Sequence, residues 1–268
     1  MALPFHLCQP GGGASCGACC GLYNFKQRSR VALTAALDRR TDTIRALPKE
    51  PDAYTRAARS LRRWDKDPLF PPVRLCPLLG FVDEARRQVG CLAHPAVTGG
   101  IDLRDCGAYD AKTCASFECP SFLWLDGPKA RLVRAACPDW YRYGLVITDV
   151  EFVRSSLKLV SDRLGAAVDP DAIVARPEAL AAAAALFALK ETAPDRPAAG
   201  DVFGRFAVDD LGEPVPRILD YERLGAGPAP EDEVVLCLGY DPADAPALER
   251  ARRLVRDHVG AVTAALEL

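Results

Sequence analysis

Three cysteines lie within five residues near the start of the chain: Cys16, Cys19 and Cys20. The spacing of Cys16 and Cys19 lets two sulfurs converge on one metal ion, because two intervening residues form a tight turn. Glycines around this turn allow positive φ and let backbone N–H groups approach the sulfurs. The adjacent pair Cys19 and Cys20 differs, because neighbouring side chains diverge. We therefore expect either a polynuclear cluster or two nearby centres.

The chain has 11 cysteines among its 268 residues, and nine of them lie in the first 119. We expect most of these nine to bind metal. The other two, Cys137 and Cys237, are predicted to be buried core thiols, as isolated cysteines commonly are. Eight of the early thiols match two sites of four cysteines each: Cys16, Cys19, Cys20, Cys76, Cys91, Cys106, Cys114 and Cys119. Cys8 and His94 are candidates for additional ligands.

Four thiolates can hold either Zn²⁺ or an iron–sulfur cluster, so the softness of the ligands does not choose between them. We favour a [4Fe–4S] cluster, because the Cys19–Cys20 pair suits a polynuclear centre better. His94 follows Cys91 by three residues, so it could ligate the metal or donate to a sulfur; the alternative is a hydrogen-bonded loop residue. No serine–histidine–aspartate set, zincin helix or paired-carboxylate motif emerges, and we assign no catalytic residue.

Composition and charge restrict the partners of the chain. It is 49% hydrophobic and 26% charged with a net charge of −2. No apolar run approaches the roughly 18 residues that span a membrane, and no signal-peptide pattern opens the sequence, so we expect a cytoplasmic protein without a membrane partner. Residues 1–145 carry 21 Lys and Arg against 14 Asp and Glu. We attribute part of this excess to compensation of thiolate charge, and expect no nucleic-acid partner, since no aromatic-basic pattern accompanies it.

The elements that must position these cysteines are predicted to be mainly helical. Apolar residues at helical spacing predict helices over 23–47, 54–64, 128–145 with a break at Pro138, 153–164, 177–190 and 245–266. Thr148 and Glu151 form a predicted capping box. Residues 67–72 and 192–200 are expected to be connecting segments, and 201–230 to be irregular. Residues 234–238 fit either a short strand or a helix fragment.

Two short apolar runs, 75–82 and 88–95, flank a charged turn and predict a β-hairpin with Cys76 and Cys91 on its paired strands. The aromatic residues near Cys114 and Cys119 are interpreted as ordinary core, with shielding of a metal centre as the alternative. The predicted fold is therefore mainly α, with a small irregular α+β cysteine-rich metal-binding core that contains the hairpin. We divide the chain into a metal-binding domain, 1–145, and a helical domain packed on it, 146–268.

The succession Cys16-Gly-Ala-Cys-Cys20, then Cys76-Pro-Leu-Leu, then Gly90-Cys91 resembles the CxxCxxCC family of zinc- or iron-chelating cysteine-cluster proteins. The resemblance covers roughly residues 8–125. It implies a set of clustered cysteine ligands, and the family includes flagellin lysine N-methylases that depend on S-adenosylmethionine. The family's first cysteine falls at Gly13 in this chain, so Cys8 replaces it or the position stays open. The equivalence of Cys106 to a family cysteine is also uncertain, because the surrounding residues differ.

Three functions are compatible with this pattern. The first is an iron–sulfur protein with a redox or transfer role. The second is a zinc-stapled module that binds a protein partner through its helical half. The third is exchangeable chelation of zinc or iron. The sequence does not identify the substrate or partner, whether protein or small molecule.

Overall fold

The computed structural model describes residues 3, 5–64, 68–194 and 202–267. The fold is mainly helical with two small antiparallel sheets, as the sequence predicts. The cysteine-rich part contains short elements around two longer helices: η1 (Ala18–Cys20), α1 (Arg30–Arg45), α2 (Pro51–Arg62), β1 (Leu79–Phe81), β2 (Val89–Cys91), α3 (Pro95–Thr98), η2 (Arg104–Cys106), α4 (Ala111–Ser116) and α5 (Pro120–Trp124). Within the described ranges, no helix is both long and apolar enough to cross a membrane.

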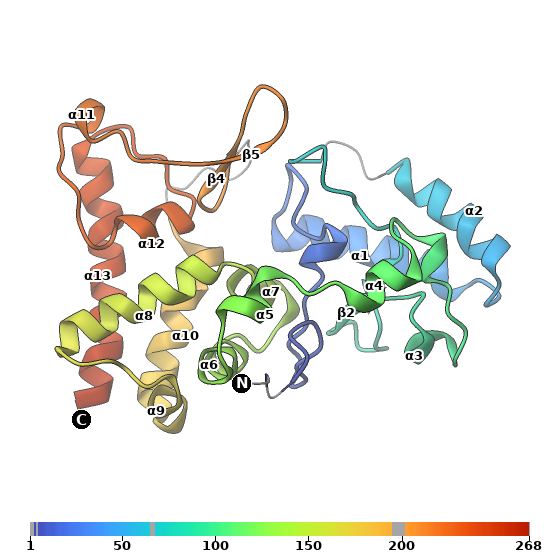
Figure 1. Ribbon diagram of the computed structural model, residues 1–268, viewed down its shortest axis with the longest axis horizontal. Helices are drawn as coiled ribbons and strands as arrows, with labels where there is room; N and C mark the ends of the chain where they lie inside the picture. Colours follow the sequence, from blue (N-terminus) through green and yellow to red (C-terminus); the bar gives the residue numbers. More distant parts are fainter. Residues whose placement is uncertain (1–2, 4, 65–67, 195–201, 268) are drawn as a thin grey trace.

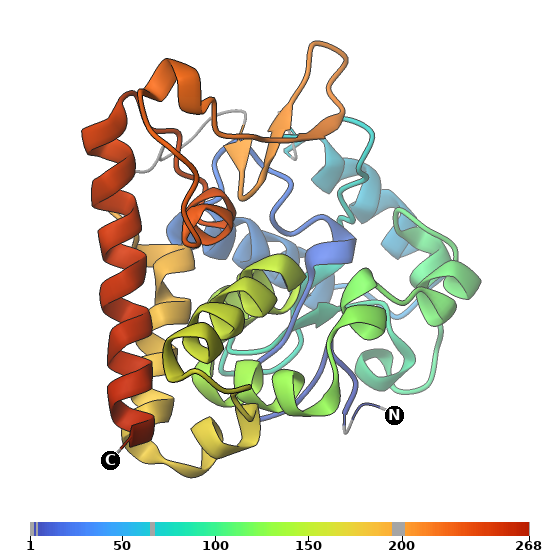
Figure 2. The same cartoon turned by 60° about the vertical axis from the view of Figure 1, so that its left-hand side comes forward.

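The rest of the chain is built mainly from helices, long and short, which occupy the left and centre of Figure 1. They are α6 (Gly127–Ala136), α7 (Trp140–Ile147), α8 (Val150–Leu164), α9 (Pro170–Ala175), α10 (Pro177–Thr192), α11 (Tyr221–Leu224), α12 (Asp232–Cys237) and α13 (Ala245–Glu267). Helices α10 and α13 pack against each other and run in opposite directions (Figures 1 and 2). Helix α8 packs on α12 and α13 and completes this bundle.

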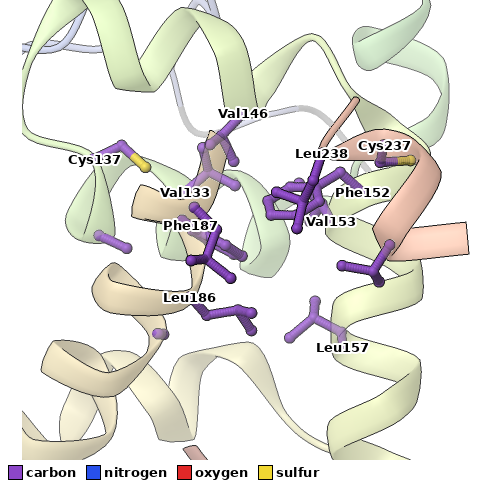
Figure 3. Close-up of a cluster of buried hydrophobic side chains, with 14 of the residues drawn as sticks. Val133, Cys137, Val146, Phe152, Val153, Leu157, Leu186, Phe187, Cys237 and Leu238 are labelled. Atoms are coloured by element: carbon purple, nitrogen blue, oxygen red, sulfur yellow. The ribbon is translucent and has the colours of Figure 1, made fainter. Parts of the chain in front are cut away.

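The largest apolar core lies among these helices. Phe152 of α8 and Phe187 of α10 meet there with ring centroids 5.9 Å apart, and both are fully buried (Figure 3). Cys137 and Cys237 lie in the same core, which confirms their prediction as buried thiols. Burial raises the pKa of both thiols, so they stay protonated at neutral pH.

The N-terminal segment joins this core. Leu7 and Cys16 are part of its apolar cluster, and the Tyr143 hydroxyl donates to the Leu7 carbonyl at 2.9 Å. Two smaller clusters lie under α1, α2 and the β1–β2 hairpin. The cysteine-rich segment is therefore anchored on the helical bundle at its beginning.

Helix boundaries differ from the sequence expectation at two places. Helix α1 begins at Arg30, not at Tyr23, because the Ser29 hydroxyl caps it by accepting from the Ala32 amide. Residues before it are held instead by Asn24, whose side-chain amide donates to the carbonyls of Phe70 and Val73 at 3.0 and 2.9 Å. Trp64, expected on the buried face of the second helix, lies beyond the end of α2 and is 64% exposed.

The predicted capping box at Thr148 is also wrong. The Thr148 hydroxyl donates to the Gly144 carbonyl at 2.6 Å, so it belongs to the last turn of α7. The N-cap of α8 is Asp149, whose carboxylate accepts from the Phe152 amide at 3.0 Å. Both residues are good capping types, and the competing bond within α7 decides which of them caps α8. The end of this helix at left-handed Gly165 agrees with the prediction.

The β1–β2 hairpin is confirmed, with Leu79 opposite Cys91 and Phe81 opposite Val89. Cys76, however, is not on the strand. It precedes β1, and its amide donates to the Cys20 carbonyl at 2.9 Å. This hydrogen bond ties Cys76 to the first cysteine segment.

The segment expected to be irregular contains a three-stranded antiparallel sheet: β3 (Val202–Phe203), β4 (Phe206–Val208) and β5 (Pro214–Pro216). Proline argues against a strand in a sequence, so this sheet was not predicted. The prolines of β5 are tolerated because β5 is an edge strand. Residues 234–238, left between strand and helix, fall on helix α12 and its C-cap. The connector expected at 67–72 lies in part, and the loop expected at 192–200 for the most part, outside the described residues.

Candidate metal centre

Four cysteines line one apolar cavity of about 220 Å³: Cys8, Cys16, Cys19 and Cys119. We name them the first thiol group. Leu7, Phe117 and Ile147 are among the apolar residues that complete its wall. The four thiols come from the N-terminal segment, from η1 and its preceding turn, and from the residue that caps α5.

Cys8 reaches this group because the chain turns back on itself between Cys8 and Cys16. Gly11, Gly12 and Gly13 all have positive φ, and the Cys16 amide donates to the Cys8 carbonyl at 3.0 Å. Gly13 has no room for a side chain, since a Cβ there would lie 2.8 Å from the Pro138 carbonyl oxygen. The position that the family resemblance assigns to a cysteine is therefore closed, and Cys8 lies among the other thiols.

The second thiol group consists of Cys20, Cys76, Cys91 and Cys114. Cys20 and Cys91 pack on the apolar cluster that contains Cys76. The charge of Cys76 acts on the other three thiols. Burial and, after it, Cys76 raise the pKa of Cys91 to about 12, and the pKa values of Cys20 and Cys114 are also raised. For Cys20 the neighbouring Cys19 is the largest cause, and for Cys114 it is burial.

The adjacent pair in η1 connects the two groups. Cys19 lines the cavity of the first group, whereas the Cys20 carbonyl and thiol lie beside Cys76. The thiols of Cys20 and Cys8 both stabilise a Cys19 thiolate and lower its pKa to about 3. The two thiol groups therefore meet at this pair, where the Cys19 and Cys20 thiols contact each other.

Burial opposes ionisation at Cys16, whose pKa it raises to about 12. The Ala18 amide donates to the Cys16 sulfur at 3.5 Å and works in the other direction. At the second group, the Arg104 guanidinium favours the thiolates of Cys91 and Cys114. Asp102 holds Arg104 in place through bonds of 2.9 and 2.7 Å. Metal coordination needs thiolates, so these contacts favour binding.

Two candidate ligands lie outside these groups. The Cys106 thiol donates to the Pro51 carbonyl at 3.5 Å, at the edge of the cluster that contains Cys76. His94 is exposed and caps α3, with its Nδ1 accepting from the Ala96 amide at 3.2 Å. His94 therefore has the hydrogen-bonded loop role that was the alternative to a ligand. His6 likewise accepts from the Cys8 amide, at 3.2 Å.

Two of the aromatic residues beyond Cys114 are exposed, contrary to the interpretation as ordinary core, whereas Phe122 packs against the helical core as expected. Phe117 is 54% exposed and Trp124 is 60% exposed. Phe117 lines the cavity of the first thiol group, and Trp124 lies under the Arg154 guanidinium.

In the described part of the chain, no group of three or more His, Cys, Asp or Glu side chains could hold a metal ion as the side chains stand. The two groups bring the required donor types together, but their thiols do not yet converge on a single point. Comparisons with family models, curated proteins and solved structures found no match for this chain.

Proposed function

We propose that this protein binds iron–sulfur clusters through the two thiol groups, Cys8, Cys16, Cys19 and Cys119 in one and Cys20, Cys76, Cys91 and Cys114 in the other. The observation that carries the proposal is the lining of one apolar cavity by four cysteines from distant parts of the chain, with Cys20 and Cys91 packed on the neighbouring cluster that contains Cys76. Core packing alone does not explain this, because Cys19 and Cys114 are exposed. Four thiolates are the ligand set of a [4Fe–4S] cluster.

The size and lining of the cavity at the first group favour a cluster over a single zinc ion. Zinc binds sulfur at about 2.3 Å and would fill little of a space of about 220 Å³. Residues such as Leu7 and Ile147 make the wall apolar, which suits a low-charge cluster that must be kept from water. Binding would require the thiols to turn inward. A bound cluster would supply one-electron chemistry at this site.

Purification under oxygen exclusion, followed by elemental analysis and an absorption spectrum, tests the proposal. We expect iron and acid-labile sulfide, together with broad absorption in the charge-transfer region of iron–sulfur clusters. Colourless protein that retains stoichiometric zinc after dialysis would refute the iron–sulfur assignment and favour the zinc-stapled module. Loss of metal to a weak chelator without any change in the fold would instead indicate exchangeable chelation.

A matched pair of variants tests whether Cys8, and not Cys106, is a metal ligand. Cys8→Ala should lower the metal content by about half, because it removes one of four ligands of the first group. Cys106→Ala should leave the metal content unchanged, since its thiol donates to the Pro51 carbonyl. The reverse result would return Cys106 to the ligand set and exclude Cys8.

A further inference from the structure

One segment of the chain supplies a thiol to each of the two groups. Cys114 belongs to the second group and Cys119 to the first, although they are neighbours in the sequence. The other thiols of both groups come from segments that end before residue 92. We name residues 107–119 the strap. In Figure 1 the strap runs from the cysteine-rich part through α4 toward α5.

The segments that carry the other thiols are held by burial and by backbone bonds. Cys16 is buried, and its amide donates to the Cys8 carbonyl at 3.0 Å. Cys76 is likewise buried, and its amide donates to the Cys20 carbonyl at 2.9 Å. Cys91 lies on β2 of the hairpin. These thiols therefore belong to segments that the fold itself holds in place.

The strap is held differently, because its middle lies on the surface. Every residue from Lys112 to Glu118 is exposed. The backbone bonds of α4 are local: the Cys114 amide donates to the Asp110 carbonyl at 3.0 Å, and the Phe117 amide donates to the Thr113 carbonyl at 3.0 Å. A segment that buries little apolar surface opens locally at a low cost in free energy.

Both ends of the strap are anchored. At its start, the Arg74 guanidinium donates to the Ala108 carbonyl at 3.0 Å. Just beyond its end, the buried Ser121 hydroxyl donates to the Ile147 carbonyl at 2.7 Å. The anchors keep the two strap thiols close to their groups, while the exposed middle leaves room for movement.

The strap thiols are also the ones that each group needs for completion. Cys114 is exposed, whereas Cys76 of its group is buried and Cys20 and Cys91 are half-buried. In the residues that the structure describes, the thiols do not yet converge on one point. Zinc and iron–sulfur centres of this type take four thiolates. Inward movement of the strap would supply the fourth ligand to each group.

We propose that the strap closes over the two thiol groups when metal is bound, and that it opens to let metal enter or leave. This inference rests on the proposed metal binding and adds the way in which the centres are filled. Metal–thiolate bonds at Cys114 and Cys119 take the place of the apolar burial that the middle of the strap lacks. Metal binding therefore stabilises the closed form over the open form.

Limited trypsin digestion of the full-length protein reports the state of the strap. Lys112 is the only Lys or Arg between Arg104 and Lys129, so a cut between these two residues identifies the strap. Cleavage of a locally opened segment follows the population of the open form. We expect loading of metal-free protein with iron and sulfide under oxygen exclusion to slow cleavage after Lys112 about tenfold or more.

A second trypsin site and two variants serve as controls. Arg87 is exposed in the β1–β2 turn, outside the strap, and its cleavage should change less than about twofold on loading. Cys114→Ser should lose the protection at Lys112, because it removes the ligand nearest to the cut. Cys106→Ala should keep the protection, since its thiol donates to the Pro51 carbonyl. Circular dichroism verifies that each variant is folded.

The outcomes separate the strap from the metal assignment. Protein that holds iron but is cut after Lys112 as fast as metal-free protein would overturn the strap and leave the proposed function intact. Protection by bound Zn²⁺ in a protein that takes up no iron would overturn the iron–sulfur assignment and support the strap. Equal slowing at Lys112 and Arg87 would show that metal orders the whole cysteine-rich half, which contradicts a strap that moves alone. A chain that binds neither metal would overturn both proposals.

Discussion

At the scale of single residues, Gly13 explains how this chain departs from the cysteine pattern that it resembles. Its positive φ and the Pro138 carbonyl oxygen, 2.8 Å from where a Cβ would lie, exclude any side chain. The same run of three glycines carries the chain back so that Cys8 lies beside Cys16. The sequence contained this signal in the form of consecutive glycines between two cysteines, but spacing rules that look only for Cys-x-x-Cys do not use it.

Cys19 and Cys20 should affect metal content at different groups. We expect Cys19→Ser and Cys20→Ser each to remove about half of the bound metal, because each takes one ligand from a different set of four. Their losses should add in the double variant. Combining Cys19→Ser with Cys8→Ser should instead remove no more than Cys19→Ser alone, since both residues line the first cavity.

Elemental analysis of the folded, gel-filtered variants measures these losses. Cys137→Ala is the control, because Cys137 is buried in the helical core and contacts neither group; it should retain the full metal content. Complete loss of metal from both Cys19→Ser and Cys20→Ser would indicate a single shared cluster.

At the scale of elements, the long helices were predictable and the short ones were not. Helix α13 shows its apolar positions from Leu248 to Val262 at regular helical spacing, and these residues are buried as expected. The 23 residues of α13 carry enough repeats for the period to be visible. Elements of three to six residues, such as η1 and α4, contain too few positions for any period, and long-range contacts define them.

The candidate site was predictable in its residue types but not in its grouping. Cys76 illustrates the limit, because it was expected on a strand paired with that of Cys91, whereas it precedes β1 and its backbone is bonded to Cys20. That contact joins segments more than 50 residues apart in the sequence. Local pattern contains no information about such a pairing, which depends on how apolar clusters from both segments are buried together.

Helices α12 and α13 are joined by an ion pair that should be among the strongest single contacts in the bundle. Arg252 donates to both carboxylate oxygens of Asp232 at 2.7 and 2.8 Å, and their side chains are 9% and 8% exposed. Arg252→Met should lower the free energy of unfolding by about 3–5 kcal/mol, because it leaves the buried Asp232 charge without its partner.

Urea unfolding followed by circular dichroism measures this change. Arg253→Met, at the exposed neighbouring position of the same helix, should change the free energy of unfolding by less than about 0.5 kcal/mol. Similar losses in the two variants would mean that the loss at Arg252 does not come from its charge pair with Asp232.

At the scale of the whole molecule, a layer of aromatic residues joins the cysteine-rich half to the helical half. The Tyr23 hydroxyl donates to the Trp140 and Tyr141 carbonyls at 3.2 and 3.0 Å. Its ring stacks on Phe203 with centroids 6.2 Å apart. Burial raises the pKa of Tyr23, and the charge of Cys16 raises it further. The cysteine-rich half and the helical half thus meet across one packed interface.

Charge pairs at that interface should make the stability of the protein fall in acid. Glu191 of α10 accepts hydrogen bonds from Arg30 of α1 and from Arg142. The pKa of Glu191 is lowered below its usual value, and the bond from Arg30 is the largest cause. A carboxylate with a lowered folded pKa stabilises the native state at neutral pH, above its ordinary pKa of about 4.3. That contribution is lost as the pH falls from there through the lowered folded pKa.

Glu191→Gln should therefore lower the free energy of unfolding by about 1–2 kcal/mol at pH 7, between the values for exposed and buried pairs. The difference from wild type should shrink as the pH falls below about 4. Urea titrations across this pH range measure it, with Glu178→Gln in the exposed first turn of the same helix as the control. A deficit that stays constant from neutral to acid pH would mean that Glu191 stabilises the junction through packing, and not through its charge.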